Sequence, residues 1–199
     1  MVQIILVRHG ETAWSASGRH TSTTDLDLTA RGADQARALA AALSGRRFAA
    51  VLCSPRLRAR RTAELAGLTV TAVDPDLAEW DYGRYEGLTT ADIRRDRPDW
   101  ILWTDGAPGG ESPEQVAART DRVLDRIRAN AAGADAAGAD IAVVAHGHLL
   151  RVAAARWIGL GPEGGARLGL DTGTLSALGF EHGTPVVTRW NAPVTATPR

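Results

Sequence analysis

Two of the predicted strands end in a histidine beside groups that bind anions. Arg8 and His9 follow the apolar run 4–7, and His146 follows the apolar run 141–145. Short apolar runs bounded by turn residues are typical of buried strands. Because the carboxyl ends of parallel strands meet at one edge of a sheet, where ligands bind, we expect these three side chains to lie close together. A guanidinium offers a planar fork of donors to oxyanions, and a neutral imidazole offers a nucleophilic nitrogen.

Another predicted strand, 48–53, leads into a helix that places a second guanidinium at the same edge. Arg58 lies in the first turn of the helix that follows this strand, where free backbone N–H groups favour an anion. Phosphoryl transfer needs charge neutralisation, an in-line nucleophile and a proton for the leaving oxygen. Glu79 is the candidate proton donor, because its aromatic neighbours would desolvate it and favour its acid form. The pattern therefore predicts phosphoryl transfer.

The composition predicts one domain and excludes several kinds of function. With 199 residues, 44% of them hydrophobic, we expect a single domain over 1–199 with an irregular excursion at about 74–110. The formal net charge is zero and all 23 positive residues are arginine, which argues against nucleic acids and membranes as partners. The absence of lysine excludes a P-loop and Schiff-base chemistry. With no signal-peptide pattern and no run of about 18 apolar residues, we expect a cytoplasmic protein.

Periodicity predicts an α/β fold whose sheet is mixed but mostly parallel, with helices on both faces. The last two strands form a hairpin, which places an antiparallel strand at the sheet edge. Segment 13–28 is expected to be a loop over the site, and 130–140 a flexible surface connection. The predicted strands are 4–7, 48–53, 68–73, 141–145, 174–180 and 185–190, and the predicted helices are 29–43, 56–66, 90–97, 149–158 and one that begins at 113.

Five segments carry a family resemblance. They are Leu-Val-Arg-His-Gly-Glu-Thr at 6–12, Ser-Pro-Arg-Leu-Arg-Ala-Arg-Arg-Thr-Ala at 54–63, Glu-Trp-Asp-Tyr-Gly-Arg-Tyr-Glu-Gly at 79–87, Gly-Gly-Glu-Ser at 109–112 and Ala-His-Gly-His at 145–148. In this order they strongly resemble the histidine phosphatase superfamily, also called phosphoglycerate-mutase-like. The match spans residues 4 to about 180. Trp14 and Ser15 with the 18–21 run, together with 79–87, resemble its acid phosphatase and sugar-bisphosphatase branch.

The resemblance implies a fold, a mechanism and a set of site residues. It implies a three-layer α/β/α sandwich with a six-stranded sheet, and a reaction that needs no metal or other cofactor. His9 would form a phosphohistidine, and Glu79 would be the proton donor. The residues implied to hold the phosphate or contact the substrate are Arg8, Ser15, Thr21, Ser22, Arg58, Tyr82, His146 and Gly147. The expected activity is a metal-independent phosphomonoesterase, acid phosphatase-like, acting on small phosphorylated metabolites.

Two other functions compete with this hypothesis. Cofactor-dependent mutases resemble the chain but carry a lysine where Thr90 stands, and an arginine pair that the region near Trp103 lacks. A non-catalytic module that binds phospholigands would have no use for an acid such as Glu79 at the leaving-group position. The substrate contacts of the first loop stay open, because relatives often have Asn where Ser15 stands and Gly where Ser22 stands.

Several residues have a second interpretation. His146 and His148 could act as metal ligands on alternate strand positions, although no third ligand is evident. The run 159–164 has the letters of a dinucleotide fingerprint but follows a helix and contains Pro162, so we expect a loop. The less favoured proton donors are Glu11, Asp81 and Glu86. The tryptophans expected to pack in the core, rather than to line a pocket or a homodimer contact, are Trp80, Trp100 and Trp103.

Overall fold

Six strands form one sheet in the computed structural model, which describes residues 1–194; the last five residues of the predicted domain, 195–199, lie outside the described residues. The strand order is β3-β2-β4-β1-β5-β6. The first four of these strands are parallel to one another, β5 is antiparallel to β1, and β6 is antiparallel to β5. The strands are β1 (Ile4–Arg8), β2 (Phe48–Cys53), β3 (Ala72–Val73), β4 (Asp140–Ala145), β5 (Leu175–Glu181) and β6 (Thr184–Ala192). The mixed, mostly parallel sheet is confirmed.

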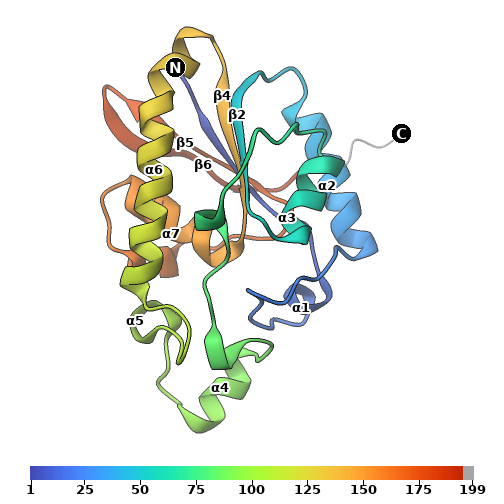
Figure 1. Cartoon of the computed structure of the whole chain (residues 1–199), viewed down its shortest axis with the longest axis vertical. Coiled ribbons are helices and arrows are strands. Elements are labelled where there is room, and N and C mark those ends of the chain that lie inside the picture. Colours follow the sequence, from blue (N-terminus) through green and yellow to red (C-terminus); the bar gives the residue numbers. More distant parts are fainter. Residues whose placement is uncertain (195–199) are drawn as a thin grey trace.

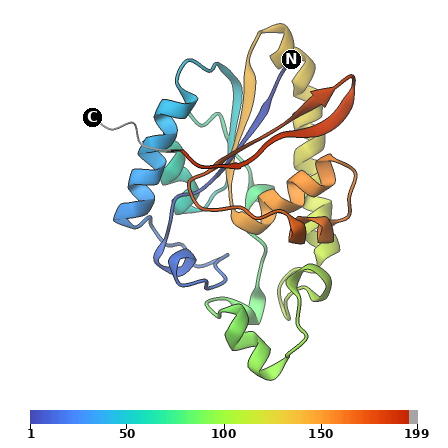
Figure 2. The same cartoon turned by 180° about the vertical axis from the view of Figure 1, so that it is seen from behind.

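Helices cover both faces of the sheet (Figures 1 and 2). Along β1, Ile4 and Leu6 enter the core beneath two of the helices, and Ile5 and Val7 enter the core beneath the other two. Successive strand residues point to opposite faces, so a strand covered on both sides reads as a continuous apolar run. The first pair is α6 (Pro113–Ala136) and α7 (Gly147–Trp157), and the second is α2 (Ala30–Leu43) and α3 (Leu57–Leu65). The predicted three-layer sandwich is therefore confirmed.

The long helices begin at capping residues that the sequence supplies. Thr29 accepts a hydrogen bond from the Gly32 N–H at the start of α2. Ser112 forms a capping box with Gln115 at the start of α6, where proline occupies the first helical position. These side chains pair amide groups that would otherwise lack an intrahelical partner.

Two short segments differ from the expectation. The predicted loop 13–28 begins with a helix, α1 (Ala13–Ala16), whose start is a capping box between Thr12 and Ser15. The strand predicted at 68–73 is shorter than expected, because β3 comprises only Ala72–Val73. Strand β3 pairs with β2 alone at the sheet edge and is exposed, so its sequence lacks the apolar run that marks a covered strand.

Two helices extend beyond their predicted ends. The connection predicted at 130–140 is wrong over most of its length, because α6 continues to Ala136. Ala131 and Ala134 prolong the buried stripe of Ile127, and alanine favours a helix while giving a weak hydrophobic signal. Helix α7 begins at Gly147 rather than 149, which places His148 in its first turn instead of on the strand.

The excursion 74–110 begins beside the sheet and then passes beyond the carboxyl ends of the parallel strands, to the bottom of Figure 1. Trp80 and Trp100 are buried in the core, as predicted, and a homodimer contact stays a prediction. The run 159–164 leaves α7 as a loop and enters a 3-10 turn. None of the helices within 1–194 is long and apolar enough to cross a bilayer. The remaining short elements are η1 (Pro75–Leu77), η2 (Gly83–Tyr85), α4 (Thr90–Asp96), α5 (Leu102–Asp105) and η3 (Pro162–Arg167).

Gly32 sets how closely α2 approaches the first active-site turn, and this predicts a stability difference between two glycine substitutions. A Cβ at Gly32 would lie 2.1 Å from the Glu11 carbonyl oxygen, whereas a Cβ at Gly133, exposed on α6, would meet nothing within 4 Å. Gly32→Ala should lower the free energy of unfolding by about 1–3 kcal/mol through overpacking. Gly133→Ala should raise it by about 0.5–1 kcal/mol. Urea denaturation measures both, and equal effects would contradict the close approach.

Candidate active site

The carboxyl ends of β1 and β4 bring the two predicted histidines together. The strands are neighbours in register, with Arg8 opposite Ala145. The ring centroids of His9 and His146 lie 5.1 Å apart, edge to face. Strand β2 reaches the same place, because Ser54 donates its backbone N–H to the Val144 carbonyl. The parallel register therefore places these residues at one edge, as the sequence predicted.

His9 is buried and held in one tautomer. Its Nδ1 lies 2.7 Å from the Gly10 carbonyl oxygen, and a carbonyl can only accept, so Nδ1 carries the proton. The Gly10 N–H donates to the Thr62 hydroxyl, which fixes the turn. Burial lowers the pKa of His9 well below its usual value, and Arg58 and Arg8 lower it further. The imidazole is therefore neutral, with its lone pair on Nε2.

His146 is oriented by Ser54. The Ser54 hydroxyl lies 2.6 Å from His146 Nε2 and accepts the Arg56 N–H. We assign the hydroxyl as the donor to Nε2, since it then donates one hydrogen bond and accepts one, and this assignment puts the imidazole proton on Nδ1. Burial lowers the pKa of His146 well below its usual value, with Arg58 as the next cause. The neutral ring thus offers an Nδ1–H donor, and this atom is buried without a partner among the described residues.

Arg8 and Arg58 each add one more buried N–H donor without a partner among the described residues. Arg58 is fully buried, and its terminal nitrogens donate to the carbonyls of Thr21, Ser22 and Thr24. Arg8 donates to the Leu170 carbonyl. Within residues 1–194, three of the four buried side-chain atoms without a partner are Arg8 Nε, Arg58 Nε and His146 Nδ1. Burying an unpaired donor is unfavourable, so such a cluster is suited to an anionic ligand.

Gly147 permits the close approach of α7 to Arg8. A Cβ at Gly147 would lie 3.2 Å from both Cζ and Nε of Arg8. A larger residue at this position would displace the guanidinium or the helix. The absence of a side chain at Gly147 therefore leaves room for the Arg8 guanidinium.

The Glu79 carboxylate binds the amino-terminal end of α7. Its Oε2 accepts the His148 N–H at 3.0 Å, and its Oε1 accepts the Leu149 N–H and the Trp80 N–H, each at 2.9 Å. Backbone amides thus hold this carboxylate, the Trp80 indole donates to the Glu111 carbonyl, and desolvation of the carboxyl by its aromatic neighbours stays a prediction. Among the described residues that line the neighbouring cavity, Glu79 is the only one with a carboxylate.

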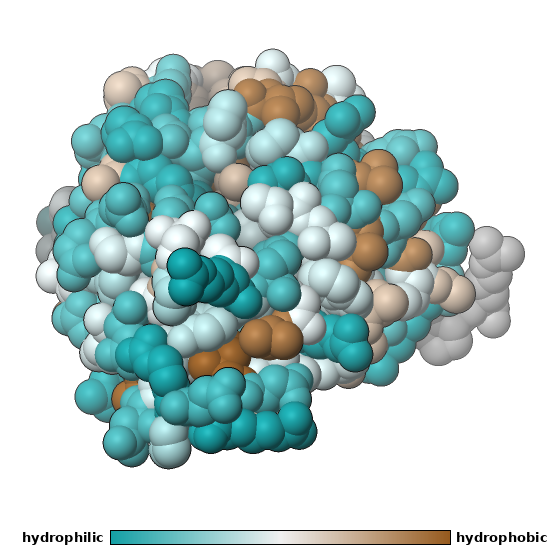
Figure 3. Space-filling model, turned by 60° about the horizontal axis from the view of Figure 1, so that its bottom comes forward, coloured by the Kyte–Doolittle hydropathy of each residue, from teal (hydrophilic) through white to brown (hydrophobic). Residues whose placement is uncertain are grey.

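A cavity of about 260 Å³ opens over His9 at the hydrophilic end of the molecule shown in Figure 3. The predicted site residues that line it are Arg8, His9, Ser15, Thr21, Glu79, Tyr82 and Gly147. Arg58 and His146 are fully buried next to His9 instead of lining the cavity. Ser22 does not line it either, because its N–H is bound by the Glu86 carboxylate and its hydroxyl donates to the Glu79 carbonyl. Ser22 therefore shapes the loop.

Sequence reasoning missed half of the cavity wall. These additional lining residues are Thr12, Gly18, Arg19, His20, Thr90, His148, Arg151 and Leu170. Arg151 could have been found, since it lies four residues after Gly147 and thus on the same helix face. Thr90 and Leu170 carry no such local signal.

Three acidic residues that could compete with Glu79, and the second histidine of the 146–148 pair, bind partners within the protein. Glu11 accepts from the Thr29 hydroxyl, Asp81 accepts the Gly83 N–H, and Glu86 holds the loop at 22–24. None of the three lines the cavity. His148 Nδ1 bonds the Tyr82 hydroxyl at 2.6 Å, whereas His146 bonds Ser54. The two imidazoles are therefore hydrogen-bonded to different protein side chains.

Loss of the Ser54 hydroxyl should disturb His146. Ser54→Ala leaves the buried Nε2 of His146 unpaired, which costs about 1–3 kcal/mol in the free energy of unfolding. Nitrogen-15 NMR of the imidazole should show that the Nδ1–H tautomer is no longer fixed. Ser17→Ala, which removes an exposed hydroxyl, should change stability by less than about 0.5 kcal/mol. An unchanged His146 tautomer in Ser54→Ala would refute the assignment.

Stability should fall as the pH drops below about 6.5. Burial lowers the pKa of His20 to about 4 and also lowers the pKa values of His9, His146 and His148. Below the unfolded-state pKa of about 6.5, the unfolded chain therefore binds protons that the folded chain does not. Each imidazole should contribute up to about 1.4 kcal/mol per pH unit between this value and its folded pKa. Urea denaturation from pH 7.5 to 5.5 should show a smaller slope for His20→Gln; an identical slope would contradict the burial effect.

Comparison with known proteins agrees with this geometry. The family model of the Histidine phosphatase superfamily (branch 1) matches residues 4–193. An acid phosphatase of Mycobacterium tuberculosis is 46% identical over 91% of this chain and 88% of its own length. A sedoheptulose 1,7-bisphosphatase of Saccharomyces cerevisiae is 38% identical over 80% of this chain and 68% of its own length. The solved structure of an open reading frame from Mycobacterium tuberculosis superimposes with a TM-score of 0.92 at 41% identity, covering 98% of this chain and 99% of that one. The chain therefore belongs to the histidine phosphatase superfamily, on the side of its acid phosphatases and sugar bisphosphatases, and is a phosphatase.

Proposed function

We propose that this phosphatase hydrolyses small phosphorylated metabolites through a phosphohistidine at His9, without a metal ion. The observation that carries the proposal is the cluster of buried donors without partners, Arg8 Nε, Arg58 Nε and His146 Nδ1, beside a neutral nucleophile. A phosphoryl group brings the oxygens that these donors lack. Two guanidiniums and an imidazole N–H neutralise its charge as the transition state forms, so no cation is needed.

The first chemical step transfers the phosphoryl group to the protein. His9 Nε2 attacks phosphorus in line with the leaving oxygen, the P–N bond forms and the P–O bond breaks. The leaving oxygen takes a proton from Glu79. Oε2 of Glu79 accepts one hydrogen bond and Oε1 accepts two, so Oε2 is the oxygen with room for that proton. This is the role that the sequence predicted for Glu79.

The second step returns the protein to its starting form. A water molecule attacks the phosphohistidine, Glu79 takes the proton of that water, and the P–N bond breaks. Inorganic phosphate is the product, and His9 is again neutral. The same carboxyl thus acts as acid in one step and as base in the next.

The shape and charge of the cavity support a small, polar substrate. About 260 Å³ accommodates a phosphate with a short polyol or sugar, and not a macromolecule. Arg19 and Arg151 line it and form no salt bridge with a carboxylate among the described residues. Relatives named for acid phosphatase and sedoheptulose 1,7-bisphosphatase activity support the same class. Thr90 lines the cavity at the position where the mutases carry a lysine, which favours hydrolysis over mutase chemistry.

Trapping the intermediate tests the proposal. The protein should be mixed with a phosphorus-32-labelled substrate and quenched in base, which preserves a phosphoramidate, or in acid, which releases it. We expect label on the protein only after the basic quench, located on His9. His9→Ala should show neither label nor turnover.

A surface histidine and a chelator complete this experiment. His182→Asn, in the exposed turn between β5 and β6, should keep both label and turnover. Wild-type turnover should survive treatment with a chelator. Full activity of His9→Ala would overturn the covalent mechanism, and loss on chelation with rescue by a divalent ion would overturn metal independence.

A further inference from the structure

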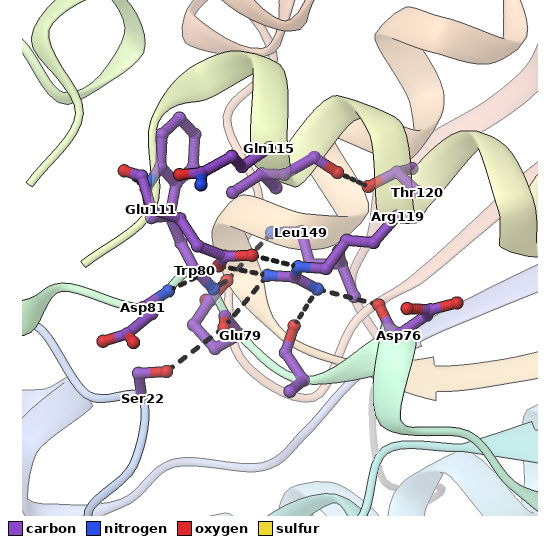
Figure 4. A network of polar contacts seen from close by, with 12 residues as sticks. Ser22, Asp76, Glu79, Trp80, Asp81, Glu111, Gln115, Arg119, Thr120 and Leu149 are labelled. Carbon is purple, nitrogen blue, oxygen red and sulfur yellow. Dashed lines mark hydrogen bonds and ion pairs between the residues drawn. The ribbon is translucent and has the colours of Figure 1, made fainter.

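Arg119 of α6 lies at the centre of a polar cluster behind Glu79 (Figure 4). Its side chain is 8% exposed and does not line the cavity. Its Nε and Nη2 donate to the two carboxylate oxygens of Glu111, at 2.7 and 2.8 Å. This bidentate geometry is the strongest form of an arginine–carboxylate pair. Arg119 is buried and Glu111 is half-buried, although nothing in the proposed mechanism uses the pair directly.

The other donors of Arg119 hold the segment that carries Glu79. Nη1 donates to the carbonyls of Asp76 and Ala78, at 2.7 and 2.6 Å. Nη2, which also binds Glu111, donates to the carbonyl of Glu79 itself, at 3.1 Å. A guanidinium has five N–H groups, and all five are used here. The backbone on the amino-terminal side of the Glu79 side chain is thus fixed by one residue.

Glu111 fixes the chain on the other side of Glu79. Its carboxylate also accepts the Asp81 N–H at 2.8 Å, and its backbone N–H donates to the Asp81 carbonyl at 2.9 Å. Its carbonyl accepts the Trp80 indole N–H at 3.0 Å. We call Arg119 with Glu111 the backbone clamp, because together they bind the main chain before, at and after Glu79.

The clamp and α7 hold Glu79 from opposite ends. Arg119 and Glu111 fix the main chain of the 76–81 segment, while the N–H groups of His148 and Leu149 bind the carboxylate. A proton donor has to lie within hydrogen-bond reach of the leaving oxygen, and a misplacement of 1 Å can cost about 10²-fold in rate. Because the carboxylate of Glu111 offsets the charge of Arg119, the clamp delivers its hydrogen bonds without adding a net charge beside the acid.

We infer that Arg119 and Glu111 are positioning residues that hold Glu79 where it can protonate the leaving oxygen. The inference rests on the proposed role of Glu79. It predicts an effect that depends on the leaving group, because an alkyl phosphate needs that proton and an aryl phosphate with a good leaving group hardly does. A purely structural role would slow both substrates alike.

The test compares kcat/KM for glycerol phosphate and for p-nitrophenyl phosphate, since kcat/KM reports the phosphorylation step. Glu79→Gln sets the full effect, a loss of about 10²–10⁴-fold for the alkyl substrate and a much smaller loss for the aryl substrate. Arg119→Lys keeps the charge but cannot bind two carboxylate oxygens and three carbonyls. We expect it to lose about 10–10²-fold on the alkyl substrate and little on the aryl substrate.

A double variant shows whether the effect passes through Glu79. In the Glu79→Gln background the proton donor is gone, so Arg119→Lys should cause no further loss on the alkyl substrate. Glu111→Gln, which preserves shape, is the second variant and should show the same dependence on the leaving group. It keeps the inference testable if Arg119→Lys fails to fold, as judged by circular dichroism.

A second arginine–carboxylate pair, between α6 and α7, serves as a matched control. Arg156 of α7 forms a bidentate pair with Asp121 of α6, at 2.9 and 2.8 Å, away from Glu79. Arg156→Lys should leave both kcat/KM values within about twofold.

The outcomes separate the inference from the proposed function. Equal losses on both substrates, or no loss, in folded Arg119→Lys and Glu111→Gln would overturn the clamp while a normal Glu79→Gln result leaves the mechanism standing. A Glu79→Gln variant without any dependence on the leaving group would instead overturn the proton-donor assignment, and the clamp with it.

Discussion

Buried hydrogen-bond donors without a protein acceptor are the constraint on which this structure depends. Arg8, Arg58 and His146 each leave one such donor near His9. A carboxylate placed among these donors would satisfy them, but it would also neutralise the positive charge of the site. The protein instead holds the donors in a rigid setting that suits an anionic ligand. The stability lost on burying them is offset by the two apolar cores on either face of the sheet.

The rigidity comes from hydrogen bonds that cross between elements far apart in the sequence. Thr62 of α3 fixes the turn after β1, and Ser54 after β2 fixes the tautomer of His146 after β4. The excursion beyond the strand ends has only short regular elements, and the Trp80 N–H is the one hydrogen bond it donates to the Glu79 carboxylate among the described residues. Helices α6 and α7 supply further hydrogen bonds, through Arg119 at the backbone of Glu79 and through amide groups at its carboxylate. Preorganised groups need no rearrangement when charge develops, which is why such sites stabilise transition states well.

The sequence by itself determined the mixed α/β sheet, most helices and the meeting of Arg8, His9 and His146 at one sheet edge. Apolar runs that end in Arg8, His9 or His146 are local signals, and the parallel arrangement of strands turns them into a shared edge without further information. Caps at Thr29 and Ser112 are local in the same way. Where the local signal was weak, as in the alanine-rich end of α6 or the exposed strand β3, the sequence-based prediction was wrong.

Only the tertiary structure decided the other half of the cavity wall, the role of Ser22 and the link from Arg119 to Glu79. The partners in these contacts lie 40 or more positions apart, as between Arg119 and the Glu79 carbonyl or between Ser22 and Glu86. Periodicity reports which face of an element is buried, but it does not report which remote backbone group that face meets. The order of strands and the path of the excursion determine those meetings, because they fix which segments share the space beyond the sheet edge.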